Sequence, residues 1–145
     1  MFIQAFFEGI LAALGSLVLG QAAILLLGQF ETILFLVIAV IEETLKFLFI
    51  FHSRLRIEAK EKILYTAPLV GIGFFSVEFF LKNQNAEEAI LWLPFLGVFF
   101  VHFVTTLICG YFTSRRYALG LLGNTLLLSF NVALHFCYNF FLSRS

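Results

Sequence analysis

One stretch of the sequence places three ionisable side chains inside an apolar run, and this limits what the chain can fold into. Glu42, Glu43 and Lys46 lie in the middle of the run from Ile33 to Phe51. If this run spans a bilayer, the three charges cost about 8–10 kcal/mol, whereas its Ile, Leu, Val and Phe residues gain about 6 kcal/mol. A helix through the run must therefore hide its charges inside a bundle, pair them or keep a carboxyl protonated. Helical spacing puts Glu42 and Lys46 on one face, with Glu43 beside them.

Composition indicates that the rest of the chain is a membrane bundle that can receive this face. Hydrophobic residues make up 61% of the 145 residues, compared with about 45–50% in soluble domains. A membrane span needs about 20 apolar residues, and we predict about five transmembrane helices. Because helices satisfy their backbone groups internally, the predicted fold class is all-α, a polytopic bundle in a single transmembrane domain over residues 1–145. The predicted spans are residues 2–27, 33–51, 63–81, 89–112 and 118–142.

The charged loops predict an orientation in the membrane. Residues 52–62 carry Arg54, Arg56, Lys60 and Lys62, and a second basic pair follows at residues 115–116. By the positive-inside rule these loops are cytoplasmic, which places the N-terminus inside and the C-terminus outside. The formal net charge is zero, so nothing indicates a nucleic-acid partner. The expected surroundings are the lipid bilayer, as for an integral membrane protein.

Four of the five predicted spans carry polar residues that are unusual in hydrocarbon. Besides the trio in the second span, these are Glu78 in the third, His102 in the fourth, and His135 with Asn139 one turn later in the fifth. At 1.5 Å per residue, Glu42 lies roughly 14 Å, His102 roughly 18 Å, His135 roughly 10 Å and Glu78 roughly 5 Å from the outer ends of their spans. These depths allow one shared pocket between the midplane and the outer surface. Intramembrane ionisable residues are candidates for a functional site.

The chemistry open to such a set is hydrolysis. A carboxylate near a histidine can deprotonate a water, and a second histidine or an amide can polarise a carbonyl. Two histidines and a carboxylate could instead bind Zn²⁺, although the sequence has no HExxH motif. A structural role also stays open, because ion pairs and interhelical hydrogen bonds stabilise many bundles.

The order of the motifs resembles the PrsW family of intramembrane proteases. The matching elements are Glu42-Glu43-x-x-Lys46, Phe74-x-x-x-Glu78, His102 and His135-x-x-x-Asn139, which span residues 33–139. That family is related to the CAAX prenyl endopeptidases and bacteriocin-processing enzymes, and more distantly to the scaffold subunit of gamma-secretase. The related endopeptidases carry EExxxR and FxxxH, so the Lys46 spacing and Glu78 place this chain on the PrsW side. Family members are usually longer than this chain.

The resemblance implies roles for these residues. Glu42 or Glu43 would be the catalytic carboxylate, with Lys46 as a supporting ion-pair partner, and Asn139 would support the oxyanion or orient His135. Glu78, His102 and His135 would hold water or, together with Glu43, a metal. Members have been described both as metalloproteases and as metal-free glutamate proteases. We favour no cofactor over Zn²⁺, because the candidate ligands come from four helices without a local chelating pair.

The resemblance also implies a substrate and a location. The substrate would be a membrane-anchored protein, such as an anti-sigma factor, cut on its outer side, and the location would be a prokaryotic plasma membrane. A homo-oligomer stays open. The rival functions are a non-catalytic scaffold subunit and a small transporter or proton channel that uses the intramembrane Glu and His residues. No inverted repeat of the kind found in many transporters is detectable.

Overall fold

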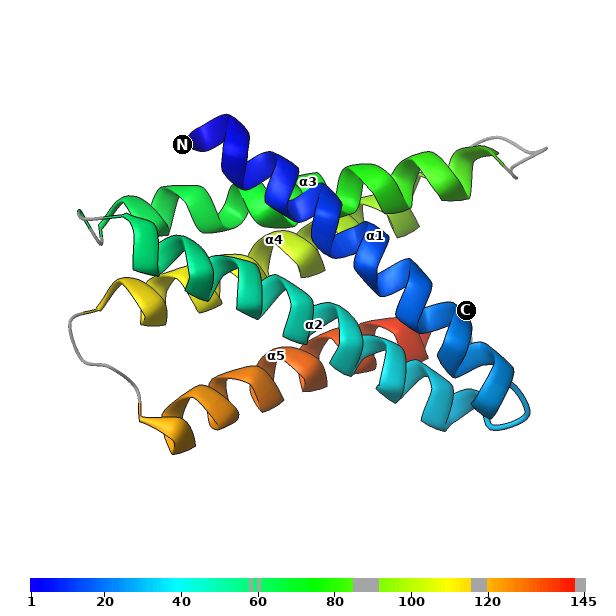
Figure 1. The fold of residues 1–145 in the computed structure, drawn as a ribbon. Helices are drawn as coiled ribbons and strands as arrows, with labels where there is room; N and C mark the ends of the chain where they lie inside the picture. The colour runs from blue at the N-terminus through cyan, green and yellow to red at the C-terminus, as the bar shows by residue number, and fades with distance from the viewer. Residues whose placement is uncertain (58, 60, 85–91, 116–119, 143–145) are drawn as a thin grey trace.

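The computed structural model describes residues 1–57, 59, 61–84, 92–115 and 120–142, and five helices account for nearly all of them (Figure 1). The described residues contain no strand, which confirms the predicted all-α class. The helices are α1 (Phe2–Leu27), α2 (Glu31–Arg56), α3 (Lys62–Gln84), α4 (Trp92–Ser114) and α5 (Leu121–Leu142).

The helix boundaries differ from the predicted spans mainly in α2. This helix begins at Glu31 and continues to Arg56, well into the stretch expected to be a basic loop. Arginine is a good helix former, and Arg54 and Arg56 in the last turn favourably oppose the partial negative charge of the helix C-terminus. The predicted starts of the fourth and fifth spans, residues 89–91 and 118–119, lie outside the described residues.

Four of the helices are long and apolar enough to cross a membrane, which is compatible with an integral membrane protein. They cover Phe2–Leu27, Lys62–Leu81, Phe95–Ser114 and Leu121–Leu142. Helix α2 is the exception among the five, as its three mid-helix charges predict. It contacts each of the other four helices, and its buried side chains recur every three or four residues: Ala39, Glu43, Lys46, Ile50 and Ser53. The charged face is therefore covered by the bundle.

Helix α1 lies across the bundle on a stripe of mostly small residues. It packs chiefly against α3 and α2, whereas α5 packs against α2 and α4. At the crossing of α1 and α3, Gly9 faces the backbone of Val70 and Phe74, and Gly73 faces the backbone of Phe6. A Cβ at either glycine would overlap these backbone atoms. The two helices are thus in close contact here, while the C-terminal half of α1 runs diagonally away from α3 towards the start of α2 (Figure 1).

An apolar layer lies about one turn from the charged residues, towards the end of the bundle where α2 finishes and α3 begins. Its buried members come from all five helices: Ala5, Ile50, Ile63, Ala67, Val70, Cys109 and Leu127. On α2, Ile50 follows Lys46 by one turn, and Ser53 follows Ile50. The layer therefore bounds the charged site on one side.

Candidate active site

Lys46 is the centre of a buried hydrogen-bonded cluster that joins α2 to α4. Its ammonium donates to Glu43 Oε1 at 2.5 Å, to His102 Nδ1 at 3.0 Å and to Thr105 Oγ1 at 3.3 Å. A lysine ammonium has three donors, so these contacts use all of them. Lys46 is only 1% exposed. Because a buried charge without partners is strongly destabilising, these three hydrogen bonds are important for the stability of the fold.

Glu43 connects the lysine to α5. The same oxygen, Oε1, lies 2.7 Å from His135 Nδ1, and Glu43 is only 2% exposed. Because the carboxylate accepts, Nδ1 of His135 carries the proton in this hydrogen bond. Glu43 therefore fixes the orientation of His135 and is not itself open to a substrate.

His102 is held at both ring nitrogens. Since an ammonium has no lone pair, Nδ1 of His102 must accept from Lys46, and the proton of the neutral ring is then on Nε2. This nitrogen donates to Glu78 Oε2 at 2.6 Å. The ring also packs on Phe74, with 4.8 Å between the ring centroids. Glu78 is thus tied to the cluster through His102.

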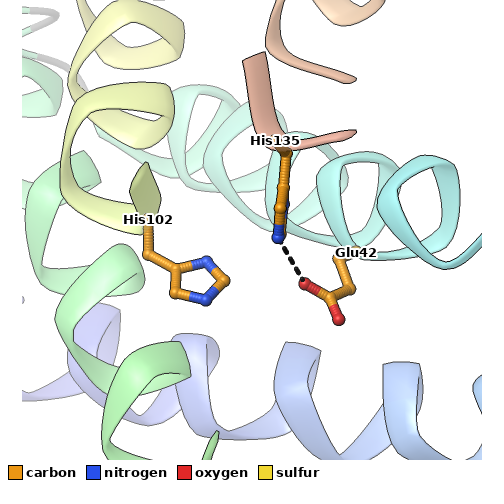
Figure 2. A group of neighbouring side chains, drawn as sticks. All are labelled: Glu42, His102 and His135. Atoms are coloured by element: carbon orange, nitrogen blue, oxygen red, sulfur yellow. Dashed lines mark ion pairs between the residues drawn. The ribbon is translucent and has the colours of Figure 1, made fainter. Parts of the chain in front are cut away.

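Glu42 and His135 approach each other where the cluster reaches its edge. Figure 2 shows the His135 ring directed at the Glu42 carboxylate, with the His102 ring beside them. His135 Nε2 lies 3.4 Å from Glu42 Oε2, an ion-pair distance at which the two atoms are not aligned as a hydrogen bond. Within the described residues this buried oxygen has no hydrogen-bond partner. With Nδ1 protonated against Glu43, Nε2 of a neutral His135 is an acceptor too, so two acceptors converge here.

A cavity of about 240 Å³ borders this edge, between α1, α2 and α3. Glu42 and Glu78 both line it, and most of its other walls are apolar. The lining residues are Ala13, Ser16, Leu17, Gly20, Gln21 and Ile24 of α1, Ile38 and Glu42 of α2, and Phe74, Val77, Glu78 and Leu81 of α3. The two half-buried carboxylates are therefore the part of the cluster that a bound molecule can reach.

Asn131 and Asn139 of α5 have different positions. Asn131 Nδ2 donates to the backbone oxygen of Thr105 at 3.2 Å and so ties α5 to α4. Asn139 is half-buried one turn after His135, and no hydrogen bond links it to the cluster in the part of the chain that the structure describes. The structure thus brings Glu42, Glu43, Lys46, Glu78, His102 and His135 together and leaves Asn139 apart from them.

Three potential metal ligands also converge, but their hydrogen bonds do not suit an ion. Atoms of Glu42, His102 and His135 lie within 4.8 Å of one another. A zinc site needs deprotonated ligand nitrogens, yet His102 uses its lone pair for Lys46 and its N–H for Glu78. Of the predicted metal ligands, Glu43 is engaged by Lys46 and His135. Glu42 and His135 Nε2 can still supply lone pairs, whereas His102 with these hydrogen bonds cannot serve as a zinc ligand.

Another buried carboxylate, Glu8, lies near the N-terminus of α1. It was not among the predicted site residues. Glu8 is 7% exposed and accepts hydrogen bonds from Ser53 Oγ at 2.6 Å and from Gln4 Nε2 at 3.0 Å. The signal in the sequence is a glutamine and a glutamate one helical turn apart inside an apolar run. This contact joins α1 to the last turns of α2.

The arrangement as a whole can activate a water. A water that reaches the Glu42 carboxylate from the cavity would donate to this carboxylate, which has His135 beside it. No protein-family model, no curated protein and no solved structure matches this chain.

Proposed function

We propose that this protein is an intramembrane protease that hydrolyses a peptide bond of a membrane-anchored protein, using a water activated by Glu42 and His135. The observation that carries the proposal is that the Glu42 carboxylate lines the cavity and also approaches His135, with 3.4 Å between Glu42 Oε2 and His135 Nε2. A carboxylate with a histidine beside it can orient and deprotonate a water. The resemblance to the PrsW motif order points to the same reaction.

The proposed reaction balances without a further reactant. Glu42 takes a proton from the water as the water oxygen attacks the carbonyl carbon of the peptide bond. The tetrahedral intermediate then breaks its C–N bond, and the nitrogen takes the proton from Glu42. The products are a carboxylic acid and an amine, and the carboxylate of Glu42 is restored. General-base assistance of this kind contributes about 10²–10⁴-fold to the rate.

The other residues of the cluster would have positioning roles. Glu43 holds His135 through Nδ1, and Lys46 holds both Glu43 and His102. Glu78, held by His102, is the second carboxylate on the cavity wall, where it can accept an N–H of the substrate. Between the two carboxylates that the motif leaves as alternatives, these contacts favour Glu42 as the catalytic one.

We propose that the reaction uses no metal, because the donors around His102 are already paired. The protein purified without added metal should then contain far less than one zinc per chain, and chelators should leave cleavage unchanged. Near-stoichiometric zinc that disappears in His135→Ala would contradict this scheme.

The proposed setting is a five-span bundle in a prokaryotic plasma membrane, with the N-terminus inside. Helix α2 would be the fifth span, since its charges face the other helices. A test uses single cysteines in a Cys137→Ser background. A cysteine at Gln29, in the turn between α1 and α2, should react with an impermeant reagent from outside, and one at Glu61 should not. The reverse pattern would invert the bundle and place the cavity near the cytoplasmic side.

The geometry favours this function over a proton channel. The polar cluster includes Glu42 and Glu78, and both carboxylates line the same cavity. On the other side lies the apolar layer around Ile50. A relay across the membrane needs polar groups that continue to the opposite side.

The deciding experiment uses the purified full chain in proteoliposomes with a panel of single-span peptides, and mass spectrometry to locate cleavage. We expect cleavage by the parent and a loss of about 10²–10⁴-fold in Glu42→Gln. Thermal unfolding in detergent checks that the variant is folded. Equal cleavage by Glu42→Gln would refute the role of this residue, and no cleavage by the parent would favour the scaffold.

A further inference from the structure

The cavity beside Glu42 lies where α1 and α3 diverge (Figure 1). The two helices touch closely at Gly9 and Gly73. The cavity lies beyond this crossing, along the second half of α1 from Ala13 to Ile24 and along α3 as far as Leu81, with α2 as the third wall. Several α1 residues beside it, including Leu17 and Ile24, are exposed on the surface of the bundle. In a membrane this surface faces lipid.

The lining is apolar with a few polar groups at defined places. Ser16 satisfies its own hydroxyl by donating to the Ala13 carbonyl at 2.8 Å. Gln21 offers an amide near the exposed side of the lining, and Glu42 and Glu78 each contribute a carboxylate to the wall. A lipid chain in this space would place hydrocarbon against the carboxylates of Glu42 and Glu78, which is costly. A peptide supplies N–H groups for the carboxylates and apolar side chains for the rest.

We infer that this cavity is the substrate groove and that it receives, laterally from the lipid between α1 and α3, an unwound segment of a membrane-spanning peptide with apolar side chains. The inference rests on the proposed function and names its substrate class. A helical segment cannot present its peptide bond, because its backbone groups are bonded internally. Unwinding frees N–H and C=O groups that need polar partners in an apolar site, and Gln21, Glu42 and Glu78 are placed to provide them.

The size of the groove restricts what can bind next to the bond that is cut. Its 240 Å³ is below the roughly 300–1,000 Å³ of typical small-molecule pockets. The groove therefore selects a short apolar stretch and disfavours acidic side chains, which would lose hydration beside the carboxylates of Glu42 and Glu78.

Gly20 offers a direct way to fill the groove. It is a buried position on the lining, yet a Cβ built there meets no atom within 4 Å. A large side chain at this position would occupy the groove without overlapping the backbone. Val18 provides a matched control, because it lies on the same helix, is 72% exposed and does not line the groove.

The first test compares Gly20→Trp and Val18→Trp in the proteoliposome assay with single-span peptides. We expect Gly20→Trp to lower kcat/KM by about tenfold or more, because the substrate must displace a packed side chain. Val18→Trp should cleave like the parent, and both variants should unfold at the parent's temperature. If Gly20→Trp is folded and cleaves at the parent rate, the groove is not the substrate path.

The second test measures binding without cleavage and covers the case in which Gly20→Trp fails to fold. In the Glu42→Gln, Cys137→Ser background, Gly20→Cys should form a disulfide with a peptide that carries one cysteine next to the bond that the parent cleaves, and Val18→Cys should not. Equal cross-linking at both positions, or none, would overturn the inference. If the parent cleaves no peptide, the proposed protease function fails. In that case each peptide of the panel would carry a cysteine in the middle of its span. Cross-linking to Gly20→Cys but not to Val18→Cys would then still assign the groove to peptide binding.

Discussion

Within the described residues carboxylates are buried in two places, and the two places differ in how completely their hydrogen bonds are satisfied. Near the N-terminus of α1, Glu8 accepts from Ser53 and Gln4. The cavity beside it holds only about 30 Å³, which is room for about one water. In the cluster around Lys46, Glu43 is equally enclosed, but Glu42 keeps an oxygen without a hydrogen bond and borders about 240 Å³.

This difference separates a structural contact from a candidate site. A buried polar group costs free energy unless it is paired, and Glu8 is paired by neutral donors that join two helices. Three charged residues within one turn and a half of α2 are more than the bundle needs to hold α2 in place. The missing hydrogen bond at Glu42 costs free energy of folding. A water or a substrate that donates to this carboxylate would offset that cost.

The largest expected effect on stability is at Lys46. Lys46→Met should reduce the free energy of unfolding by about 3–5 kcal/mol, because it leaves the buried carboxylate of Glu43 without its cation. The double variant Lys46→Met/Glu43→Gln should recover part of this loss, since it removes the stranded charge. Reversible unfolding in mixed micelles measures both. If Lys46→Met alone is as stable as the parent, the lysine does not neutralise Glu43.

A smaller effect is expected at the other carboxylate. Ser53→Ala removes the 2.6 Å hydrogen bond to Glu8 and should cost about 1.5–3 kcal/mol, as for other hydrogen bonds to charged groups. Cleavage by the folded fraction should stay at the parent rate, because the apolar layer separates Ser53 from the site. A loss of kcat/KM with unchanged unfolding would show that the two polar centres are coupled.

Much of the fold could be predicted from the sequence because it depends on local features. The apolar run from Phe2 to Leu27 matches α1 at both ends, and helical spacing placed the charges of α2 on a buried face. The end of α2 was missed because Arg54 and Arg56 suggest a cytoplasmic loop by charge, whereas they also favour helix. Positive charge indicates which side of the membrane a segment occupies but does not determine where a helix stops.

The partition of roles within the site could not be predicted from spacing. At i, i+3 and i, i+4, Glu43 and Glu42 are both able to reach Lys46. The structure pairs Lys46 with Glu43 and turns Glu42 to His135, because the neighbouring helices decide which carboxylate faces the interior. Glu8 was missed for the same reason, since its partner Ser53 is 45 residues away in the sequence.

The smallest expected effect is at Asn139, which has no hydrogen bond to the cluster among the described residues. The resemblance implies that Asn139 supports the oxyanion or orients His135, but Glu43 already orients that ring through Nδ1. Asn139→Ala should therefore change kcat/KM by about twofold at most, and the free energy of unfolding by about 0.5 kcal/mol or less. Asn131→Ala serves as the comparison, because it removes a buried contact with Thr105 and should cost about 0.6–1.7 kcal/mol. A hundredfold loss of cleavage in Asn139→Ala without a change in unfolding would mean that substrate binding moves α5 and brings this amide to the reacting carbonyl.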